Sequence, residues 1–308
     1  MRVFQGLEDF VKEQVPLADL TSYRVGGPAE FLATPPDEAG LSAALARAAE
    51  AGLPVHVLGL GTNLLVADEG VRGLVVKLPR DGFGDLELDG MTLRVGAGHS
   101  LPSLVKWALG EGWGGLEFLA GVPGTVGAAL RMNAGGKYGH IGSCVSGVSG
   151  CELNGRPFRL EAEECGFEYR DSQLKDRIVT RCELALEGIP PDQSGALYGR
   201  ILAEKAASQP LHARSAGCVF KNPRQPGVPP AGRLIEELGL KGLRAGGASV
   251  SMRHANFLVC SGESRAADVA ELIRTIRRCA WAERGVRLEL EIAVWGIRPE
   301  ELWTADVA

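Results

Sequence analysis

Apolar residues recur at helical spacing in the first quarter of the chain. A proline and two acids precede them and Gly52 follows them, so the pattern predicts a helix over 36–52. The apolar face of this helix consists of Leu41, Ala44, Leu45 and Ala48. Two short apolar runs, at 55–58 and 74–78, predict strands. This first stretch is therefore expected to form a small α/β unit.

The middle of the chain changes to short apolar runs separated by turns. These runs predict strands around residues 92–95, 145–153, 158–160 and 178–186. One helix is predicted among them, with Ser100 as its cap and Gly112 as its end.

Helical spacing returns toward the end of the chain. It predicts helices from near Ser194 to before Pro210, over 231–238 and over 264–284. A last strand is expected over 286–294, because apolar and charged residues alternate there. We expect three domains, over residues 1–79, 80–193 and 194–308.

Composition and charge limit the classes of function. With 308 residues, 45% of them hydrophobic, the chain can bury a sizeable core. A net charge of −5 argues against a broad basic surface for nucleic acid. No run of 18 apolar residues could span a membrane, and charges interrupt the start of the chain, unlike in a signal peptide. We expect a cytoplasmic monomer without nucleic-acid or membrane partners.

The seven cysteines do not form a recognisable metal or redox motif. Their number is odd and no Cys-x-x-Cys pair occurs. We therefore expect reduced thiols and no metal site.

Two glycine-rich segments are the first sign of a ligand. Residues 59–66 follow a predicted strand, and their glycines let successive N–H groups approach an anion. This segment matches neither a dinucleotide G-x-G-x-x-G that opens a helix nor a Walker loop, so alone it favours an ordinary turn. Residues 121–139 hold many more small residues, which suit a backbone that wraps a flat or charged ligand.

These segments resemble the flavin-binding motifs of the UDP-N-acetylenolpyruvoylglucosamine reductase family. Residues 21–29, 61–65, 121–127 and 132–135 occur in the family's order, and the resemblance covers nearly the whole chain. It implies an α+β fold: a two-part FAD-binding fold of the vanillyl-alcohol-oxidase/p-cresol-methylhydroxylase type, followed by a C-terminal α+β substrate domain. The FAD-binding residues that it implies are Tyr23, Arg24, Val25, Gly26, Gly59, Gly61, Thr62, Asn63, Leu64, Leu65, Gly121, Pro123, Gly124, Thr125, Gly127, Asn133, Ala134 and Gly135.

Arg170 is the first candidate for the chemistry. It follows Tyr169 in a polar stretch, and its planar fork can clamp a carboxylate with two hydrogen bonds. A surface arginine paired with Asp171 is the competing interpretation. The family's Tyr-Arg-x-Ser motif resembles this stretch, and it implies that Arg170 binds the enolpyruvyl carboxylate beside Tyr169 and stabilises the enolate.

Cys218 is the sharpest departure from the family pattern. Residues 216–223 resemble a signature in which a serine protonates the substrate carbon, and Cys218 takes that place. A free thiol ionises near pH 8.5, so at neutral pH it can still donate a proton. A buried structural cysteine is the alternative. The same signature implies that Lys221 and Asn222 bind substrate.

Glu291 is the third candidate catalytic residue. It lies in a stretch that resembles the family's Leu-Glu-x-Glu-Val strand, whose second glutamate completes the active site. Alternation places Glu289 and Glu291 on one face, so periodicity does not choose between them, and a solvated acidic face is a competing interpretation. His254 also falls in a family-like motif, and we interpret it as structural.

The resemblance implies a complete reaction. NADPH passes a hydride to FAD, reduced FAD delivers it to the methylene carbon of UDP-N-acetylglucosamine enolpyruvate, and Cys218 protonates the neighbouring carbon. Two alternatives stay open: a flavin-dependent oxidase of the same fold, and a non-catalytic flavin- or sugar-nucleotide-binding relative. The interval from Arg170 to Cys218 is short, and Tyr198 is its only tyrosine. This indicates the shorter subtype, which lacks a tyrosine-bearing substrate loop.

Overall fold

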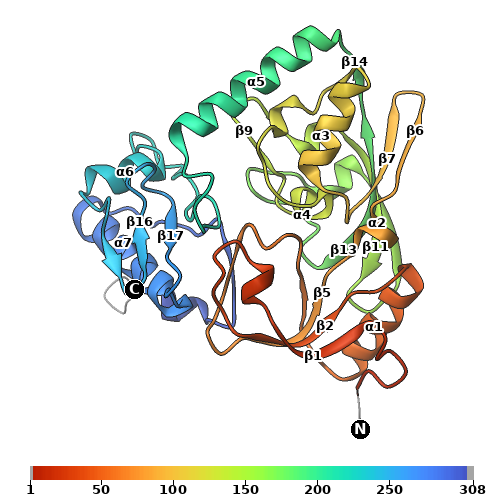
Figure 1. Ribbon diagram of the computed structural model, residues 1–308, viewed down its shortest axis with the longest axis horizontal. Coiled ribbons are helices and arrows are strands. Elements are labelled where there is room, and N and C mark those ends of the chain that lie inside the picture. Colours follow the sequence, from red (N-terminus) through yellow and green to blue (C-terminus); the bar gives the residue numbers. More distant parts are fainter. Residues whose placement is uncertain (1–2, 304–308) are drawn as a thin grey trace. The chain divides into compact units, whose positions relative to one another are not determined.

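The computed structural model describes residues 3–303, apart from the side chains at 191, 192 and 194 (Figure 1). The chain divides into two compact units, each assembled from separate stretches. The first unit combines the chain up to Gln14 with Glu30–Leu60 and Arg72–Lys205. The second combines Val15–Ala29 and Gly61–Val71 with the chain from Ala206 onward. The three-domain division stays a prediction.

Helices contribute buried apolar residues to both units. The α-helices are α1 (Glu38–Glu50), α2 (Arg80–Phe83), α3 (Leu101–Gly110), α4 (Val126–Arg131), α5 (Pro191–Ser208), α6 (Ala231–Glu237) and α7 (Ala266–Arg284). Short 3₁₀ helices occur at η1 (Ala18–Leu20), η2 (Glu117–Leu119), η3 (Ile141–Ser143), η4 (Ala162–Cys165) and η5 (Pro299–Leu302).

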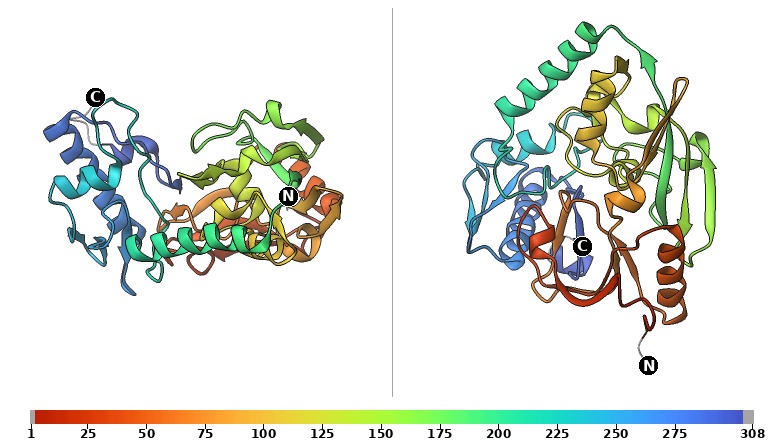
Figure 2. Two further views of the ribbon diagram at one scale, coloured as in Figure 1. Left: turned by 90° about the horizontal axis from the view of Figure 1, so that it is seen from above. Right: turned by 45° about the vertical axis from the view of Figure 1, so that its right-hand side comes forward.

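An antiparallel five-stranded sheet is the largest element of the first unit. Its order is β12 (Pro157–Glu161), β11 (Val145–Glu152), β13 (Arg177–Ala185), β7 (Thr92–Gly96) and β6 (Leu86–Asp89). The helices α3 and α4 lie against it in Figures 1 and 2, and their apolar residues share one buried cluster with those of β7, β11 and β13.

A second sheet in the order β1-β2-β5-β3 packs against α1. Its strands are β1 (Val11–Pro16), β2 (Pro28–Ala33), β5 (Val71–Val76) and β3 (Val55–Val57). The predicted apolar face of α1 is fully buried in its core, which confirms that prediction. The side chain of Asp37 caps α1 by accepting a hydrogen bond from the Gly40 N–H at 2.8 Å.

The second unit packs α6 and α7 around short strands. The sheet order is β15 (Arg244–Ala245), β16 (Ala248–Val250) and β17 (Leu258–Cys260). Nearby, β18 (Ala293–Trp295) pairs in parallel with β4 (Leu64–Val66). Two further pairs belong to the first unit and join β10 (Gly139–His140) to β9 (Gly135–Gly136) and β14 (Glu187–Gly188) to β8 (Trp113–Gly114).

The predicted strand over 286–294 is wrong as a continuous element. Leu290 forms a single bridge with Phe220, and only Ala293–Trp295 is a regular strand. The reason is a bulge: the N–H groups of Glu291 and Ile292 both donate to the Val219 carbonyl, at 2.8 and 3.5 Å. Two residues facing one interrupt the ladder there.

Most of the other predicted elements are present with shifted ends. The predicted helices near 194–209, 231–238 and 264–284 correspond to α5, α6 and α7. Ser100 caps α3 by accepting from the Ser103 N–H at 3.4 Å, as predicted. The sequence pattern missed β1, β2 and α4, the last of which lies inside the second glycine-rich segment.

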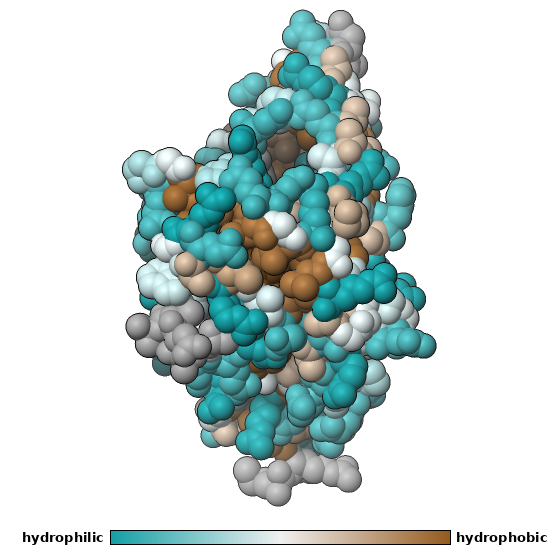
Figure 3. All heavy atoms as spheres, turned by 90° about the vertical axis from the view of Figure 1, so that its left-hand side faces the viewer, coloured by the Kyte–Doolittle hydropathy of each residue, from teal (hydrophilic) through white to brown (hydrophobic). Residues whose placement is uncertain are grey.

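Hydrophilic side chains cover most of the face displayed in Figure 3, and hydrophobic ones gather near its centre. Among the described residues, no helix is long and apolar enough to cross a bilayer.

His254 packs inside the second unit. Its ring meets Phe257 edge-on at 4.9 Å, and its Nδ1 accepts a hydrogen bond from the Asn256 N–H at 3.3 Å. That bond requires the neutral ring. Burial, followed by the charge of Lys241, lowers the pKa of His254 below its ordinary value of 6.5.

The lowered pKa of His254 predicts a loss of stability in mild acid. The unfolded chain binds the proton more tightly than the folded one, so the free energy of unfolding falls as the pH drops from 6.5 through the folded-state pKa. Urea unfolding at pH 7.5 and 5.0 measures this. His254→Gln should reduce the difference, whereas the same change at the exposed His212 should not. If the two variants lost the same free energy of unfolding between pH 7.5 and 5.0, His254 would not be the cause of the acid sensitivity.

Candidate active site

The two glycine-rich segments meet within the first unit. Gly59 follows β3, and a Cβ there would lie 3.1 Å from the Cβ of Ala128 and 3.2 Å from Oγ1 of Thr125. Ala128 belongs to α4 and Thr125 is its cap. Glycine therefore lets the end of β3 approach the start of α4 more closely than another residue would.

The start of α4 fits an anionic group such as a dinucleotide phosphate. Gly124 has φ of +133°, a conformation that residues with a Cβ rarely adopt. Its carbonyl accepts from the Leu101 N–H, and the Thr125 hydroxyl accepts from the Ala128 N–H. Within residues 3–303, the N–H groups of Gly124 and Thr125 donate to no protein atom, as expected of backbone that binds an anion.

The flavin motifs in the second unit are built on close backbone contacts. A Cβ on Gly61 would lie 2.1 Å from the Leu20 carbonyl oxygen, and one on Gly26 would lie 2.7 Å from the Val66 oxygen. Both glycines have positive φ, as does Arg24 at +55°. The sequence thus needs glycine at 26 and 61 to form this fold.

Several residues implied as FAD-binding have buried side chains. They are Tyr23, Val25, Leu64 and Leu65. Burial, as the largest cause, raises the pKa of the Tyr23 hydroxyl, so this side chain is neutral. Tyr23, Val25 and Leu65 pack in the core of the second unit, which is a structural role that sequence patterns do not distinguish from cofactor contact.

Arg170 occupies a tight turn in the first unit. The N–H of Glu168 donates to the Asp171 carbonyl at 2.9 Å, and the reverse bond measures 3.2 Å. Arg170, the second of the two central residues of the turn, has φ of +56°. An arginine in the left-handed region is strained by about 1–2 kcal/mol relative to the right-handed one. Tyr169 is 43% exposed, and its ring centre lies 5.6 Å from Cζ of Arg170.

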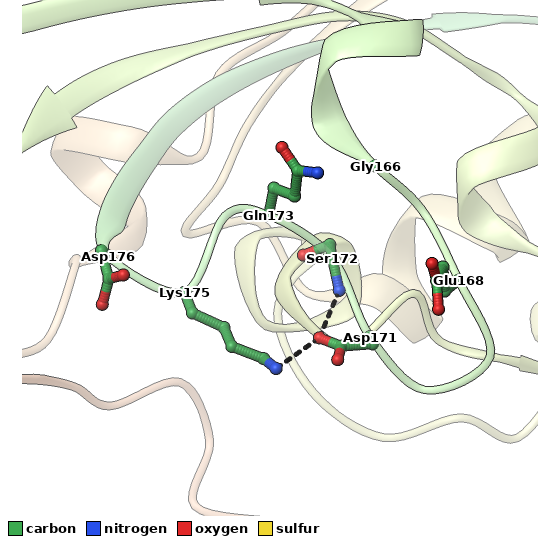
Figure 4. Close-up of a pocket in the computed structure, with 7 residues that line it drawn as sticks. All are labelled: Gly166, Glu168, Asp171, Ser172, Gln173, Lys175 and Asp176. Carbon is green, nitrogen blue, oxygen red and sulfur yellow. Dashed lines mark hydrogen bonds and ion pairs between the residues drawn. The ribbon is translucent and has the colours of Figure 1, made fainter.

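A pocket of about 380 Å³ lies beside this turn (Figure 4). Figure 4 shows Lys175 reaching Asp171, at 2.6 Å, while the same carboxylate accepts from the Ser172 N–H at 2.7 Å. Lys175 thus competes with Arg170 for Asp171, the partner expected if Arg170 were a surface ion pair. The lining residues are Gly166, Glu168, Asp171, Ser172, Gln173, Lys175 and Asp176.

The Cys218 segment is held by a buried asparagine that sequence reasoning missed. Asn256 is 3% exposed, and its side chain accepts from the Phe220 N–H at 2.9 Å and donates to the Phe220 carbonyl at 2.8 Å. The backbone carbonyl of Asn256 also accepts a hydrogen bond from the Val219 N–H. Asn256 lies two residues after His254 in the same motif, which is the signal that could have identified it.

Cys218 itself is half-buried and belongs to no disulfide. By contrast, Cys144, Cys151, Cys165 and Cys182 are buried, and burial raises the pKa of each thiol. These four thiols therefore stay protonated and out of reach, as inert structural residues do.

The structure distinguishes the two glutamates after α7. Glu289 is 73% exposed, with its carboxylate 3.8 Å from the Lys221 amine, whereas Glu291 is half-buried. The Glu291 carbonyl accepts from the side-chain amide of Asn63 at 3.0 Å. This bond joins one predicted flavin-loop residue to one predicted catalytic residue inside the second unit.

Asn222 has a structural contact of its own. Its side-chain oxygen accepts a hydrogen bond from the Ala231 N–H, at the first turn of α6, at 3.0 Å.

Gly127, on α4, lies close to β7 and its following loop. A Cβ at this position would lie 2.9 Å from the Cβ of Ala97, so glycine allows this close packing.

The stretch from Arg170 to Cys218 is occupied by regular structure. It contains β13, β14 and α5, and Tyr198 packs against the core of the first unit. Lys205, on α5, donates to the Ala120 carbonyl at 2.6 Å, next to the second glycine-rich segment.

The fold and these glycine-built segments are those of a flavin-binding protein. A family model described as an FAD binding domain matches residues 29–160, which confirms the predicted FAD-binding α+β fold. A second model, described as the C-terminal domain of UDP-N-acetylenolpyruvoylglucosamine reductase, matches residues 209–295.

Full-length relatives agree with both models. The chain is 45% identical over 292 residues to UDP-N-acetylenolpyruvoylglucosamine reductase 2 of Symbiobacterium thermophilum, covering 94% of this chain and 93% of that one. It is 45% identical to the reductase of Moorella thermoacetica, over 94% and 95% of the two chains. The crystal structure of the Thermus caldophilus reductase superimposes with a TM-score of 0.80 at 42% identity, covering 93% of this chain and 100% of that one. The chain belongs to the UDP-N-acetylenolpyruvoylglucosamine reductase family.

The strain at Arg170 predicts an unusual order of stabilities. Arg170→Gly and Arg170→Ala lose the same side chain, but only glycine relieves the left-handed backbone, so the glycine variant should be more stable by about 1 kcal/mol. Chemical denaturation of both variants measures this. At Tyr169, whose φ is not positive, alanine should be at least as stable as glycine. The same order at both positions would show that Arg170 is unstrained.

Proposed function

We propose that this chain is an FAD- and NADPH-dependent reductase that converts UDP-N-acetylglucosamine enolpyruvate to UDP-N-acetylmuramate. The observation that carries the proposal is identity of 42–45% to reductases of that name over more than nine-tenths of both chains. The reaction is a cytoplasmic step of peptidoglycan precursor synthesis. Its partners are small molecules, the UDP-sugar and NADPH.

Two stretches of backbone are suited to FAD. The N–H groups of Gly124 and Thr125 donate to no atom of the described residues, and the loop from Gly61 to Asn63 begins at a glycine with positive φ. When bound, FAD supplies the hydride that NADPH provides. The protein supplies orientation and charge.

Arg170 binds the carboxylate of the enolpyruvyl group. Its guanidinium offers two parallel N–H donors, and the same charge stabilises negative charge that develops on the substrate during reduction. Tyr169, 43% exposed beside it, contributes to the same site. Lys221 and Asn222 also bind substrate.

Cys218 donates the proton to the substrate carbon, and Glu291 assists from the adjacent bulged segment, where its N–H donates to the Val219 carbonyl. A thiol is a stronger acid than the serine hydroxyl of the family signature, so it stays competent at neutral pH but loses its proton at moderately alkaline pH. The bond from the Asn63 amide to the Glu291 carbonyl and the bonds from Asn256 to Phe220 hold both segments.

The proposal predicts two separable half-reactions. Under anaerobic conditions, NADPH should bleach the visible absorbance of bound FAD, and UDP-N-acetylglucosamine enolpyruvate should restore it. Flavin that is re-oxidised by oxygen but not by the sugar nucleotide would contradict the reductase and indicate an oxidase. Flavin that NADPH does not reduce would indicate a non-catalytic relative.

The role of Cys218 predicts a specific pH profile. Cys218→Ala should slow re-oxidation by the sugar nucleotide by about 10²- to 10⁴-fold, the usual contribution of a general acid, and Cys218→Ser should recover part of it. Wild-type turnover should fall at alkaline pH as the thiol loses its proton, and the serine variant should not follow. Cys279→Ala, at another half-buried thiol, is the control. Unchanged re-oxidation in Cys218→Ala would overturn the role.

A further inference from the structure

The turn that carries Arg170 is hydrogen-bonded on both sides to the end of α4 and the residues just after it. Before the turn, the Glu168 carbonyl accepts from the side-chain amide of Asn133 at 2.8 Å. After it, the Ser172 hydroxyl donates to the Arg131 carbonyl at 2.7 Å. Arg131 ends α4, and all of these residues belong to the first unit. The glycine-rich segment and the arginine turn are therefore one connected structure.

Asn133 is itself held firmly. It is 3% exposed, and its side-chain oxygen accepts from the Gly142 N–H at 3.0 Å. Its φ is +44°, which asparagine tolerates better than most residues. Moving the amide away from Glu168 would leave a buried donor unsatisfied, at about 1–3 kcal/mol.

The turn needs this restraint because its own bonds are few. The Glu168 carbonyl uses its two lone pairs on the Asp171 N–H and on Asn133. Arg170, between Glu168 and Asp171 in the chain, has a left-handed backbone conformation, which persists only where surrounding contacts hold it. Ser172 is 4% exposed and also accepts from the Leu174 N–H, so the second tie is buried too.

We propose that Asn133 is a positioning residue for Arg170, with Ser172 as the second tie, and that its side chain is not an FAD ligand. This rests on the proposed function, in which Arg170 binds the enolpyruvyl carboxylate. The resemblance alone assigned Asn133 to FAD. The contacts of its amide with Glu168 and Gly142 assign it to the carboxylate site.

Asn133→Asp tests this with the smallest change of shape. Aspartate tolerates a positive φ and keeps an acceptor for the Gly142 N–H, but it replaces the donor to the Glu168 carbonyl with a repelling oxygen. Asn154→Asp is the matched control, because Asn154 is exposed and its side-chain oxygen only accepts, from the Arg156 N–H.

The expected result separates the two half-reactions. Asn133→Asp should retain wild-type FAD content and reduction by NADPH within about twofold. Re-oxidation by the enolpyruvyl sugar nucleotide should slow by about 10- to 100-fold, as displaced binding groups do. Amide hydrogen exchange over residues 168–172 should accelerate in the same variant, which needs no turnover to measure. The control should change none of these.

A double-mutant cycle decides whether Asn133 acts through Arg170. In an Arg170→Ala background, Asn133→Asp should have little further effect on re-oxidation, because the group that it positions is gone. Full additivity would overturn the proposal, as would loss of FAD or slower reduction by NADPH. If wild-type flavin were not re-oxidised by the sugar nucleotide at all, the proposed function would fail, while faster exchange would still support the structural tie.

Ser172→Ala is a second, milder variant. It removes the bond to the Arg131 carbonyl and should slow re-oxidation and accelerate exchange at 168–172 in the same pattern, by a smaller factor. Unchanged exchange and unchanged re-oxidation in Ser172→Ala would overturn the proposed bracing even if Asn133→Asp did not fold.

Discussion

Side-chain amides stand in for strand partners where three candidate reactive segments leave regular secondary structure. A buried peptide group must be hydrogen-bonded, and an irregular segment lacks a neighbouring strand to do it. In this chain three asparagines supply the missing donor or acceptor. They act on the carbonyl of Glu291 through Asn63, on that of Glu168 through Asn133, and on both polar groups of Phe220 through Asn256. The geometry of the candidate site depends on these bonds.

The same segments carry backbone conformations that ordinary helices and strands do not offer. Arg24, Asn133 and Arg170 all have positive φ. Such residues are strained, so they need support from outside their own turn. At the Arg170 turn, the hydrogen bond from the Asn133 amide supports a strained backbone conformation. The strain lowers the intrinsic stability of the turn, while the bond fixes where its side chains point.

The sequence predicts what local physics determines. The faces of α1 and α7 follow from helical period and from glycine ends, which need no distant contact. The strand at 286–294 failed because its bulge depends on pairing with Val219, far away in the chain. The glycine-rich segments indicated a ligand site. The hydrogen bonds of Asn256 to Phe220 and of Asn133 to Glu168 could not be predicted, because they join residues 36 and 35 positions apart. Motif resemblance finds such residues without saying what they touch.

The parallel pairing of β4 with β18 has a consequence for synthesis on the ribosome. Leu65 leaves the ribosome early, yet its strand partner Val294 follows more than two hundred residues later. At about 5–20 residues per second, that interval lasts on the order of 10–40 seconds. During it, the first unit can be completed while the apolar Tyr23, Val25 and Leu65 still lack their core partners. A nascent chain of this kind therefore keeps an early apolar segment without its packing partners for most of its own synthesis.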